Sequence, residues 1–275
     1  MGRTAARRPI VHIDVGTGVS RRPDTVAAEE PLEIRVGRAP IAVTMRTPGD
    51  DLDLALGFLL TEGVIAAASD VRTAQLCAGD NAPNTYNVVD VRLADGVAPP
   101  ATDPTRNFYT TSSCGVCGKA SIDAVRTRSR YPVAADPLRL PAALVASLPG
   151  RLRAAQPGFD RTGGLHAAGL FTADGDLLCV REDIGRHNAV DKVIGWAVRE
   201  SRLPLTGHVL VVSGRASFEL TQKASMAGIP ALVAVSAPST LAVDLAAEVG
   251  LTLVAFARGT TMNVYAGSER IADVP

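Results

Sequence analysis

The sequence lacks an excess of charge of either sign and contains few aromatic residues. Lysine plus arginine and aspartate plus glutamate number 28 each in 275 residues, so the formal net charge is zero, and aromatic residues make up 4%. A general nucleic-acid binder needs a basic surface, and a single-strand binder needs aromatic stacking platforms. These absences disfavour bulk nucleic acid as a partner but allow a single phosphorylated ligand.

Long apolar runs and a dense cysteine framework are also absent. The first 30 residues carry five arginines and no continuous apolar stretch, so we expect neither a signal peptide nor a membrane span. Four cysteines are too few for a secreted disulfide scaffold and fit a reducing compartment. We therefore expect a cytoplasmic protein with no membrane partner.

The remaining composition is that of a globular protein. The chain is 47% hydrophobic and 20% charged, which allows a sizeable core in one or two domains. We predict a loop or mobile N-terminal tail over residues 1–30, a smaller β-rich N-terminal subdomain over 31–105 and an α/β domain over 106–275. The boundary near residue 105 follows a stretch rich in Pro, Ala and Asp that is typical of a long loop.

The predicted N-terminal subdomain contains strand, turn and helix signals. Two short alternating runs in residues 31–46 flank Gly37-Arg38 and predict a β-hairpin. Leucines at helical spacing predict a helix between Asp50 and Gly63, and residues 86–93 have the pattern of a strand.

The second half alternates solid apolar runs with amphipathic segments. The runs Val209–Val212, Ala231–Val235 and Leu251–Phe256 predict strands that are buried on both faces. Between them, Ala216–Ala227 and Ser239–Val249 are long enough for crossover helices, the second with Ser239 as its N-cap. This βαβαβ pattern predicts an α/β fold with parallel strands. A hairpin over residues 166–180 is expected to precede it.

Ligands of such sheets bind outside the carboxyl ends of the strands, where loops lead into helix N-termini. The three loops predicted there are Ser213-Gly214-Arg215, residues 236–240 and, after the last strand, residues 257–261. All are small and bear glycine or hydroxyl groups, and two contain an arginine, which suits a phosphate group. Loops of this kind are often small and polar without any ligand, so that alternative stays open.

One cysteine pair is placed for chemistry. Cys114 and Cys117 are separated by Gly115-Val116 and followed by a lysine and a helical stretch, an arrangement that favours the thiolate. Structural zinc would need two more ligands, and Cys77 and Cys179 are isolated and expected to be small buried hydrophobes. A zinc deaminase is disfavoured because no His-x-Glu occurs. A dithiol oxidoreductase and a persulfide carrier both remain open.

Residues 181–192 form a second cluster, with seven ionisable side chains around a predicted helix start. One interpretation is a solvated helix N-terminus with Asp183 as its cap. The other makes Arg186 and His187 donors to an anionic ligand. His166, at the start of a predicted strand, is expected to be a packed or hydrogen-bonded residue rather than a catalyst.

Taken together, six ordered motifs resemble those of the formate dehydrogenase accessory sulfurtransferases, the FdhD family. They lie at residues 113–118, 162–167, 182–192, 213–219, 235–243 and 251–256. The resemblance extends from about Pro31 to Tyr265.

The resemblance implies a cytidine-deaminase-like sheet flanked by helices, without zinc, in a homodimer. It also implies an enzyme that accepts persulfide sulfur from a cysteine desulfurase and transfers it to the molybdenum of the bis(molybdopterin guanine dinucleotide) cofactor, its bound substrate, for formate dehydrogenase. Cys114 would carry the persulfide and Cys117 would assist its transfer. A dithiol–disulfide oxidoreductase and a non-catalytic chaperone of the molybdenum cofactor are the alternatives.

The residues expected to hold the cofactor combine the family motif with the predicted ligand loops. They are Phe256, Ala257, Arg258, Gly259, Thr260, Thr261, Ser213, Arg215, Arg186 and His187. Many relatives have Gly-Arg where this chain has Thr260-Thr261, although Arg258 lies close by in the sequence.

Overall fold

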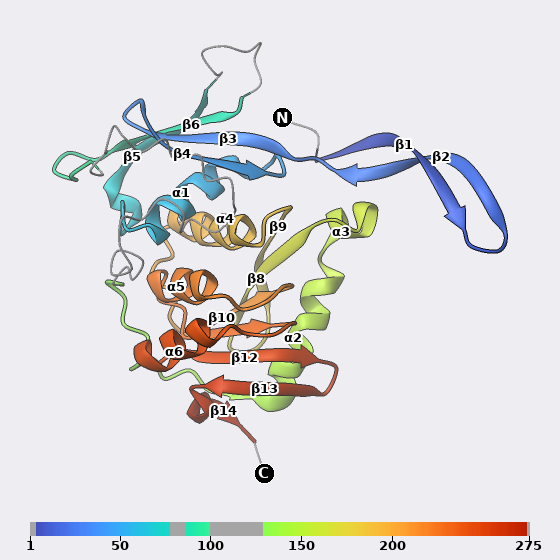
Figure 1. Ribbon diagram of the computed structural model, residues 1–275. Coiled ribbons are helices and arrows are strands. Elements are labelled where there is room, and N and C mark those ends of the chain that lie inside the picture. The colour runs from blue at the N-terminus through green and yellow to red at the C-terminus, as the bar shows by residue number, and fades with distance from the viewer. Residues whose placement is uncertain (1–3, 78–85, 100–128, 274–275) are drawn as a thin grey trace.

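The computed structural model describes residues 4–77, 86–99 and 129–273 (Figure 1). The predicted subdomain boundary near residue 105 and the cysteine pair at 114–117 lie outside these ranges. Within the described ranges, no helix is both long and apolar enough to cross a membrane.

The N-terminal residues form a β-ribbon that projects from the body of the protein (Figure 1). β1 (Ala5–Asp14) and β2 (Gly18–Ala27) pair antiparallel along their whole length. The expectation of a loop or tail over residues 1–30 is therefore wrong for residues 5–27. Pro9 and Pro23, which lie opposite each other in this ribbon, disguise it in the sequence because proline is rare within strands.

A four-stranded sheet follows, with strand order β4-β3-β6-β5. β3 (Glu30–Val36) and β4 (Ala39–Arg46) form the predicted hairpin, and β6 (Val88–Leu93) is the predicted strand; β5 (Val71–Cys77) has no counterpart among the predictions. Gly37 and Arg38 both have positive φ at the hairpin turn. The inward side chains of β3, Leu32, Ile34 and Val36, are buried.

Two helices with glycines at their crossing join this sheet to the second half of the chain. α1 (Asp51–Thr61) is the predicted helix, and it packs against α4 (Arg186–Arg199). A Cβ on Gly57 would lie 1.8 Å from the carbonyl oxygen of Asp191, and a Cβ on Gly195 would lie 1.7 Å from that of Asp53. Only glycine permits this approach, and it lets both halves of the protein share one hydrophobic core.

The larger sheet has six strands in the order β13-β12-β11-β10-β8-β9. As predicted, β10 (His208–Val212), β11 (Ala231–Ala234) and β12 (Thr252–Arg258) are parallel and are linked by α5 (Phe218–Met226) and α6 (Thr240–Val249). The predicted N-cap is also confirmed, because the Ser239 hydroxyl accepts a hydrogen bond from the Ala242 N–H. β8 (His166–Thr172) and β9 (Leu177–Asp183) form the predicted hairpin at one side of the sheet.

Both faces of this sheet are covered, which explains why its strands are continuously apolar. Leu210 and Val212 of β10 pack into the core with α1, α4, α5 and α6, whereas Val209 and Val211 pack with α2 (Ala142–Ala154) on the other face. The α/β fold with flanking helices and an N-terminal β-rich part is thus as predicted. Within the described ranges, the remaining elements are α3 (Pro157–Thr162), β7 (Leu140–Pro141), β13 (Thr261–Ala266), β14 (Ile271–Ala272) and the short 3₁₀ helices Ala68–Asp70 and Ser268–Arg270.

Candidate functional site

A cavity of about 500 Å³ opens where the parallel strands end. Its lining includes Ser213 after β10, Val235 after β11, and Ala257, Arg258 and Gly259 at the end of β12. This is the edge at which α/β sheets bind ligands, and the volume falls in the usual range of small-molecule sites, about 300–1,000 Å³. Four of the predicted cofactor-binding residues therefore line one cavity.

Ser213 and His166 lie side by side at this edge. The Ser213 hydroxyl accepts a hydrogen bond from the Ala167 N–H at 2.9 Å and lies 3.4 Å from Nδ1 of His166. Burial, helped by the charge of Arg186, lowers the pKa of His166 from 6.5, so the neutral ring is favoured near pH 7. The contact with Ser213 agrees with the expectation of a hydrogen-bonded histidine. Because His166 also lines the cavity, a ligand bound there would contact it.

Arg186 and His187 begin α4 next to this pair. Gly214 lies close to both His166 and Arg186, because a Cβ on it would be 3.5 Å from the His166 ring and 3.8 Å from Cδ of Arg186. His187 is 2% exposed, and its Nε2 lies 3.5 Å from the Ser217 hydroxyl and 3.9 Å from a Glu219 carboxylate oxygen. Within the described residues, Arg186 Nε and His187 Nδ1 are buried without a hydrogen-bond partner.

The pKa values of His187 and Glu219, which are in contact, are both shifted. Burial lowers the pKa of His187, while the hydrogen bond from His187 is the main cause that lowers the pKa of Glu219 to about 2. Glu219 is therefore ionised at neutral pH. Buried polar atoms with unmet hydrogen-bonding capacity, beside groups with shifted pKa values, make this corner a candidate for contact with a ligand.

The alternative of a solvated helix N-terminus capped by Asp183 is wrong. Asp183 is fully buried, Gly185 is the N-cap residue, and no side chain caps it. The Asp183 carboxylate accepts hydrogen bonds from the backbone N–H groups of Gly185 and Thr47 and forms an ion pair with Lys192 at 2.7 Å. Long-range packing of α1 and β4 onto α4 buries these charges, and this could not be seen from local spacing.

The last predicted loop is in fact a β-hairpin. β12 runs through Arg258, Gly259 and Thr260 form the turn, and Thr261 begins the antiparallel β13. A register shift between Ala255 and Arg258 leaves Phe256 with a left-handed φ of 51° and a ring that is 38% exposed. A non-glycine residue in this conformation is strained, and such strain is concentrated at functional sites.

Several cavity residues were not anticipated from the sequence. Arg153 at the end of α2 lies over the Phe159 ring at 4.5 Å, and both line the cavity with the buried Gln156. The first turn of α3 is held by the Glu182 carboxylate, which accepts hydrogen bonds from the N–H groups of Gly158 and Phe159, both at 2.7 Å. The available signal was Pro157 at the start of a helix, beside the glycines of the 162–167 motif.

Other predicted residues lie outside the cavity. Arg215, Thr260 and Thr261 are exposed, and Phe256 lies next to lining residues without lining the cavity itself. Arg186 and His187, at the start of α4, do not line the cavity either. The catalytic candidates Cys114 and Cys117 lie outside the described residues, so their meeting with these loops stays a prediction.

The two isolated cysteines are described. Cys179 is buried, as expected, and burial raises the pKa of its thiol to about 12, which makes it unreactive near pH 7. Cys77 is half-buried. Among the described residues, no group of three or more His, Cys, Asp or Glu side chains is placed to hold a metal ion.

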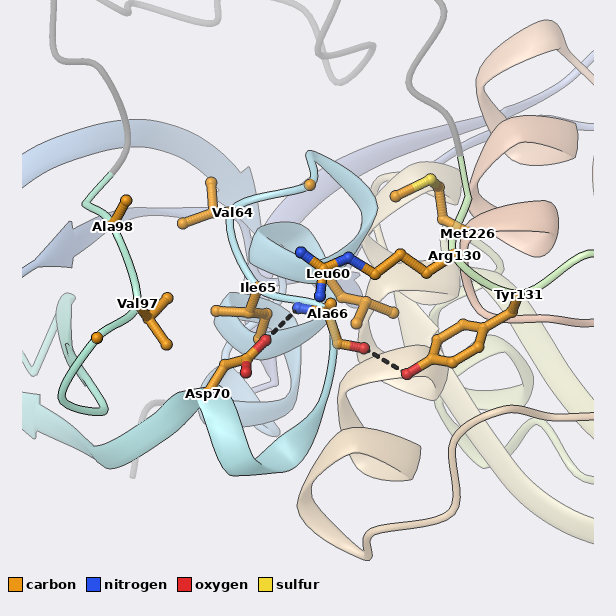
Figure 2. A pocket seen from close by; sticks show the side chains of 12 residues that line it. Leu60, Val64, Ile65, Ala66, Asp70, Val97, Ala98, Arg130, Tyr131 and Met226 are labelled. Carbon is orange, nitrogen blue, oxygen red and sulfur yellow. Dashed lines mark hydrogen bonds between the residues drawn. The ribbon is translucent and has the colours of Figure 1, made fainter.

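A second cavity, of about 510 Å³, lies between the segment that follows α1 and the end of α5 (Figure 2). Met226 at the end of α5 lines it, together with Leu60, Ile65 and the backbone of Ala66, which accepts a hydrogen bond from the Tyr131 hydroxyl. The cavity contains none of the predicted ligand loops. The carboxyl edge therefore remains the candidate site.

Comparisons with known proteins identify the family. The profile of the FdhD/NarQ family matches residues 27–272, nearly the whole described chain. The chain belongs to the FdhD/NarQ family. This FdhD/NarQ chain is 62% identical over 275 residues to the "Sulfur carrier protein FdhD" of Streptomyces coelicolor, covering 99% of this chain and 97% of that one. It is 60% identical over 271 residues to the same-named protein of Mycolicibacterium paratuberculosis, covering 98% and 99%.

A solved structure shares the fold. The crystal structure of a putative formate dehydrogenase accessory protein from Desulfotalea psychrophila matches this FdhD/NarQ chain with a TM-score of 0.76 and 25% identity. The match covers 98% of this chain and 100% of the other. The fold predicted from the six motifs is thus the fold of a relative over its full length.

Proposed function

We propose that this FdhD/NarQ protein is a cytoplasmic sulfurtransferase that takes sulfur from a cysteine desulfurase and delivers it to the molybdenum cofactor of formate dehydrogenase. Its curated relatives are named sulfur carrier proteins, and its solved relative is described as a formate dehydrogenase accessory protein. The proposed substrate is the bis(molybdopterin guanine dinucleotide) cofactor. The active species is proposed to be a homodimer.

The observation that carries the proposal is the cavity at the carboxyl edge. Arg153 and Arg258 supply positive charge, Ser213 and His166 supply hydrogen-bonding groups, and Gly163 and Gly259 leave backbone exposed to a ligand. Phosphates are commonly bound by such a combination. The cavity suits one guanine nucleotide arm of the cofactor, and the strained, exposed Phe256 beside it offers a ring on which guanine can stack.

The loading step is a thiol exchange. The Cys114 thiolate attacks the outer sulfur of the donor's persulfide, a new S–S bond forms on Cys114, and the donor leaves as a thiolate. No net oxidant or reductant is needed. The sequence places Lys119 and a predicted helical stretch after the cysteine pair, and both would favour the Cys114 thiolate.

The delivery step breaks the Cys114 S–S bond and passes the outer sulfur to molybdenum as sulfide. This transfer requires two electrons. Cys117 supplies them when its thiolate forms a disulfide with Cys114, and a cellular dithiol must then reduce that disulfide before the next cycle. The proposal thus gives the two cysteines different roles.

The test is mass spectrometry of the full chain after incubation with a cysteine desulfurase and cysteine. We expect one added sulfur atom on a peptide containing residues 112–119 in the wild type and in Cys117→Ala, and none in Cys114→Ala. Cys179→Ala, which changes a buried and unreactive thiol, is the matched control and should load normally. Sulfur that stays on Cys114→Ala overturns the assignment.

The same variants separate the alternatives. A dithiol oxidoreductase would reduce insulin and lose that activity equally in Cys114→Ser and Cys117→Ser. A cofactor chaperone would support formate dehydrogenase with both cysteines replaced. Guanosine diphosphate should raise the melting temperature of the protein more than adenosine diphosphate does, and equal shifts would argue against a guanine site.

A further inference from the structure

The β1–β2 ribbon is the least covered part of the protein. It extends away from the body (Figure 1), and its apolar side chains Val11, Ile13, Val15 and Val19 are 55%, 65%, 95% and 68% exposed. An isolated two-stranded ribbon is at best marginally stable in water, because neither face is buried. Clustered exposed apolar side chains of this kind mark an interaction surface.

The strand register sorts the side chains onto two different faces. Cross-strand partners share a face, so one face carries Val11, Ile13 and Val19 with both prolines, two arginines and no acid, whereas Ile10 and Val26 lie on the opposite face. The residues of the first face are Arg7, Pro9, Val11, Ile13, Val19, Arg21, Pro23 and Thr25. We call this the apolar face. The other, mixed face pairs Arg8 with Asp24 and places His12 3.5 Å from Arg22.

The edges of the ribbon are closed to further strand pairing at their midpoint. The Ala28 N–H donates to the Thr4 carbonyl, so Thr4 and Ala28 form a hydrogen-bonded pair. Hydrogen-bonded and non-hydrogen-bonded pairs alternate along an antiparallel ladder, and in this register Pro9 and Pro23 form a non-hydrogen-bonded pair. The backbone nitrogens of such a pair point outward, and proline has no N–H to donate. Both edges therefore lack a donor at this pair, which is how natural sheets prevent edge-to-edge addition. An association through the ribbon is therefore expected to use one of its faces.

The size of one face favours a reciprocal contact. Ten residues per strand give a length of about 33 Å, and two strands give a width of about 10 Å, so one face covers about 330 Å². One ribbon on an unrelated partner would bury only about 660 Å², whereas two ribbons exchanged between identical copies would bury about 1,300 Å². Stable interfaces bury about 1,200–2,000 Å² in total.

The distribution of net charge along the chain also favours association of two copies. Residues 5–27 carry four arginines and two aspartates, a net charge of +2, and because the whole chain is neutral the remaining residues carry −2. The ribbon of one copy and the body of another thus have opposite charge. The ribbon also leaves the body beside the cavity, since a Cβ on Gly164, a lining residue, would lie 3.6 Å from that of Ala27.

We propose that the β1–β2 ribbon is an exchange arm through which two copies of this chain associate, with its apolar face packed on the second copy. A twofold axis repeats each contact, so one substitution changes the interface twice. The proposal names a surface and does not depend on sulfur transfer. It rests on the homodimer proposed above. A dimeric deletion variant would refute the role of the ribbon and leave that homodimer in place, whereas a failure of sulfur loading would leave the role of the ribbon untouched.

The test compares two neighbouring substitutions by sedimentation equilibrium of the full chain. Val19→Asp adds a carboxylate to the apolar face, and Ser20→Asp adds the same charge one residue later on the mixed face. We expect the wild type to sediment as a dimer of a 28.6 kDa chain. Val19→Asp should raise the dissociation constant at least about tenfold, and Ser20→Asp should change it less than about twofold.

A ribbon deletion, with residues 9–23 replaced by Asn-Gly, keeps the test decisive if a single substitution disturbs the ribbon itself. We expect a monomer whose body melts at the wild-type temperature when both are compared at monomeric concentration. The proposal is overturned by a monomeric wild type, by a dimeric deletion variant, or by equal weakening in Val19→Asp and Ser20→Asp. If the wild type is a monomer, the apolar face would instead be a contact surface for a different protein.

Discussion

The crossing of α1 and α4 predicts an unusually severe effect of adding one methyl group. Gly195 of α4 faces the backbone of α1, and a Cβ on it would lie 1.7 Å from the Asp53 carbonyl oxygen and 2.7 Å from the Gly57 nitrogen. Both neighbours are backbone atoms and cannot rotate away. Gly195→Ala therefore requires the helices to separate by more than 1 Å, because real Cβ atoms do not approach closer than 3.0 Å.

Separation of these helices disturbs interactions beyond the contact itself. Asp53 pairs with Arg181 at 2.8 Å and with Arg199 at 2.9 Å, and the core around the crossing joins the two halves of the protein. Overpacking in cores costs about 1–3 kcal/mol and more where nothing can move. We expect Gly195→Ala to lower the free energy of unfolding by about 3 kcal/mol or more, which corresponds to a fall in melting temperature of about 6–12 °C.

Thermal and urea unfolding of the full chain measure this effect. Gly150→Ala is the matched control, because Gly150 also lies within a helix but a Cβ there meets no atom within 4 Å. The control should be stabilised by about 0.5–1 kcal/mol, since alanine favours the helix. A Gly195→Ala variant within about 1 kcal/mol of the wild type would refute the close crossing.

Three further predictions concern the candidate site. Arg258→Ala should weaken guanosine diphosphate binding by about tenfold or more in calorimetry, whereas the exposed Arg215→Ala should change it less than twofold, because only Arg258 lines the cavity. Phe256→Ala should weaken the same binding by about five- to tenfold through lost stacking, and Tyr265→Ala, which removes an equally exposed ring from β13, should not. Because burial lowers the pKa of His187 below 6.5, the unfolded chain takes up a proton first, so stability should fall as pH drops below 6.5; an unchanged slope in His187→Gln would contradict this.

Local sequence patterns were sufficient for much of the fold. The three apolar runs became β10, β11 and β12, and Ser239 caps α6, because strand burial and helix capping depend on residues close in sequence. The carboxyl edge of these strands also holds the cavity, as the topology predicts.

Patterns that depend on distant partners were misjudged. The sequence predicts a tail where the ribbon lies. Pro9 and Pro23 fit a two-stranded ribbon only where their nitrogens point away from the partner strand, and that register is not visible in the local sequence. The sequence predicts a ligand loop after the last strand, but the chain turns at Gly259 and returns as the antiparallel strand β13. In both cases, local sequence patterns do not show which segment pairs with the strand.

The sequence by itself determined the family, the α/β architecture and the edge of the sheet where a ligand would bind, since motif order and hydrophobic periodicity are written along the chain. Only the tertiary structure decided that Arg258 and Arg153 face the cavity and Arg215 does not, and that Asp183 is a buried ion-pair partner instead of a solvated cap. The physical reason is that burial and direction are set by elements far apart in sequence. Arg186 Nε and His187 Nδ1, in the segment that follows Asp183, are buried without a hydrogen-bond partner among the described residues, and neither residue lines the cavity.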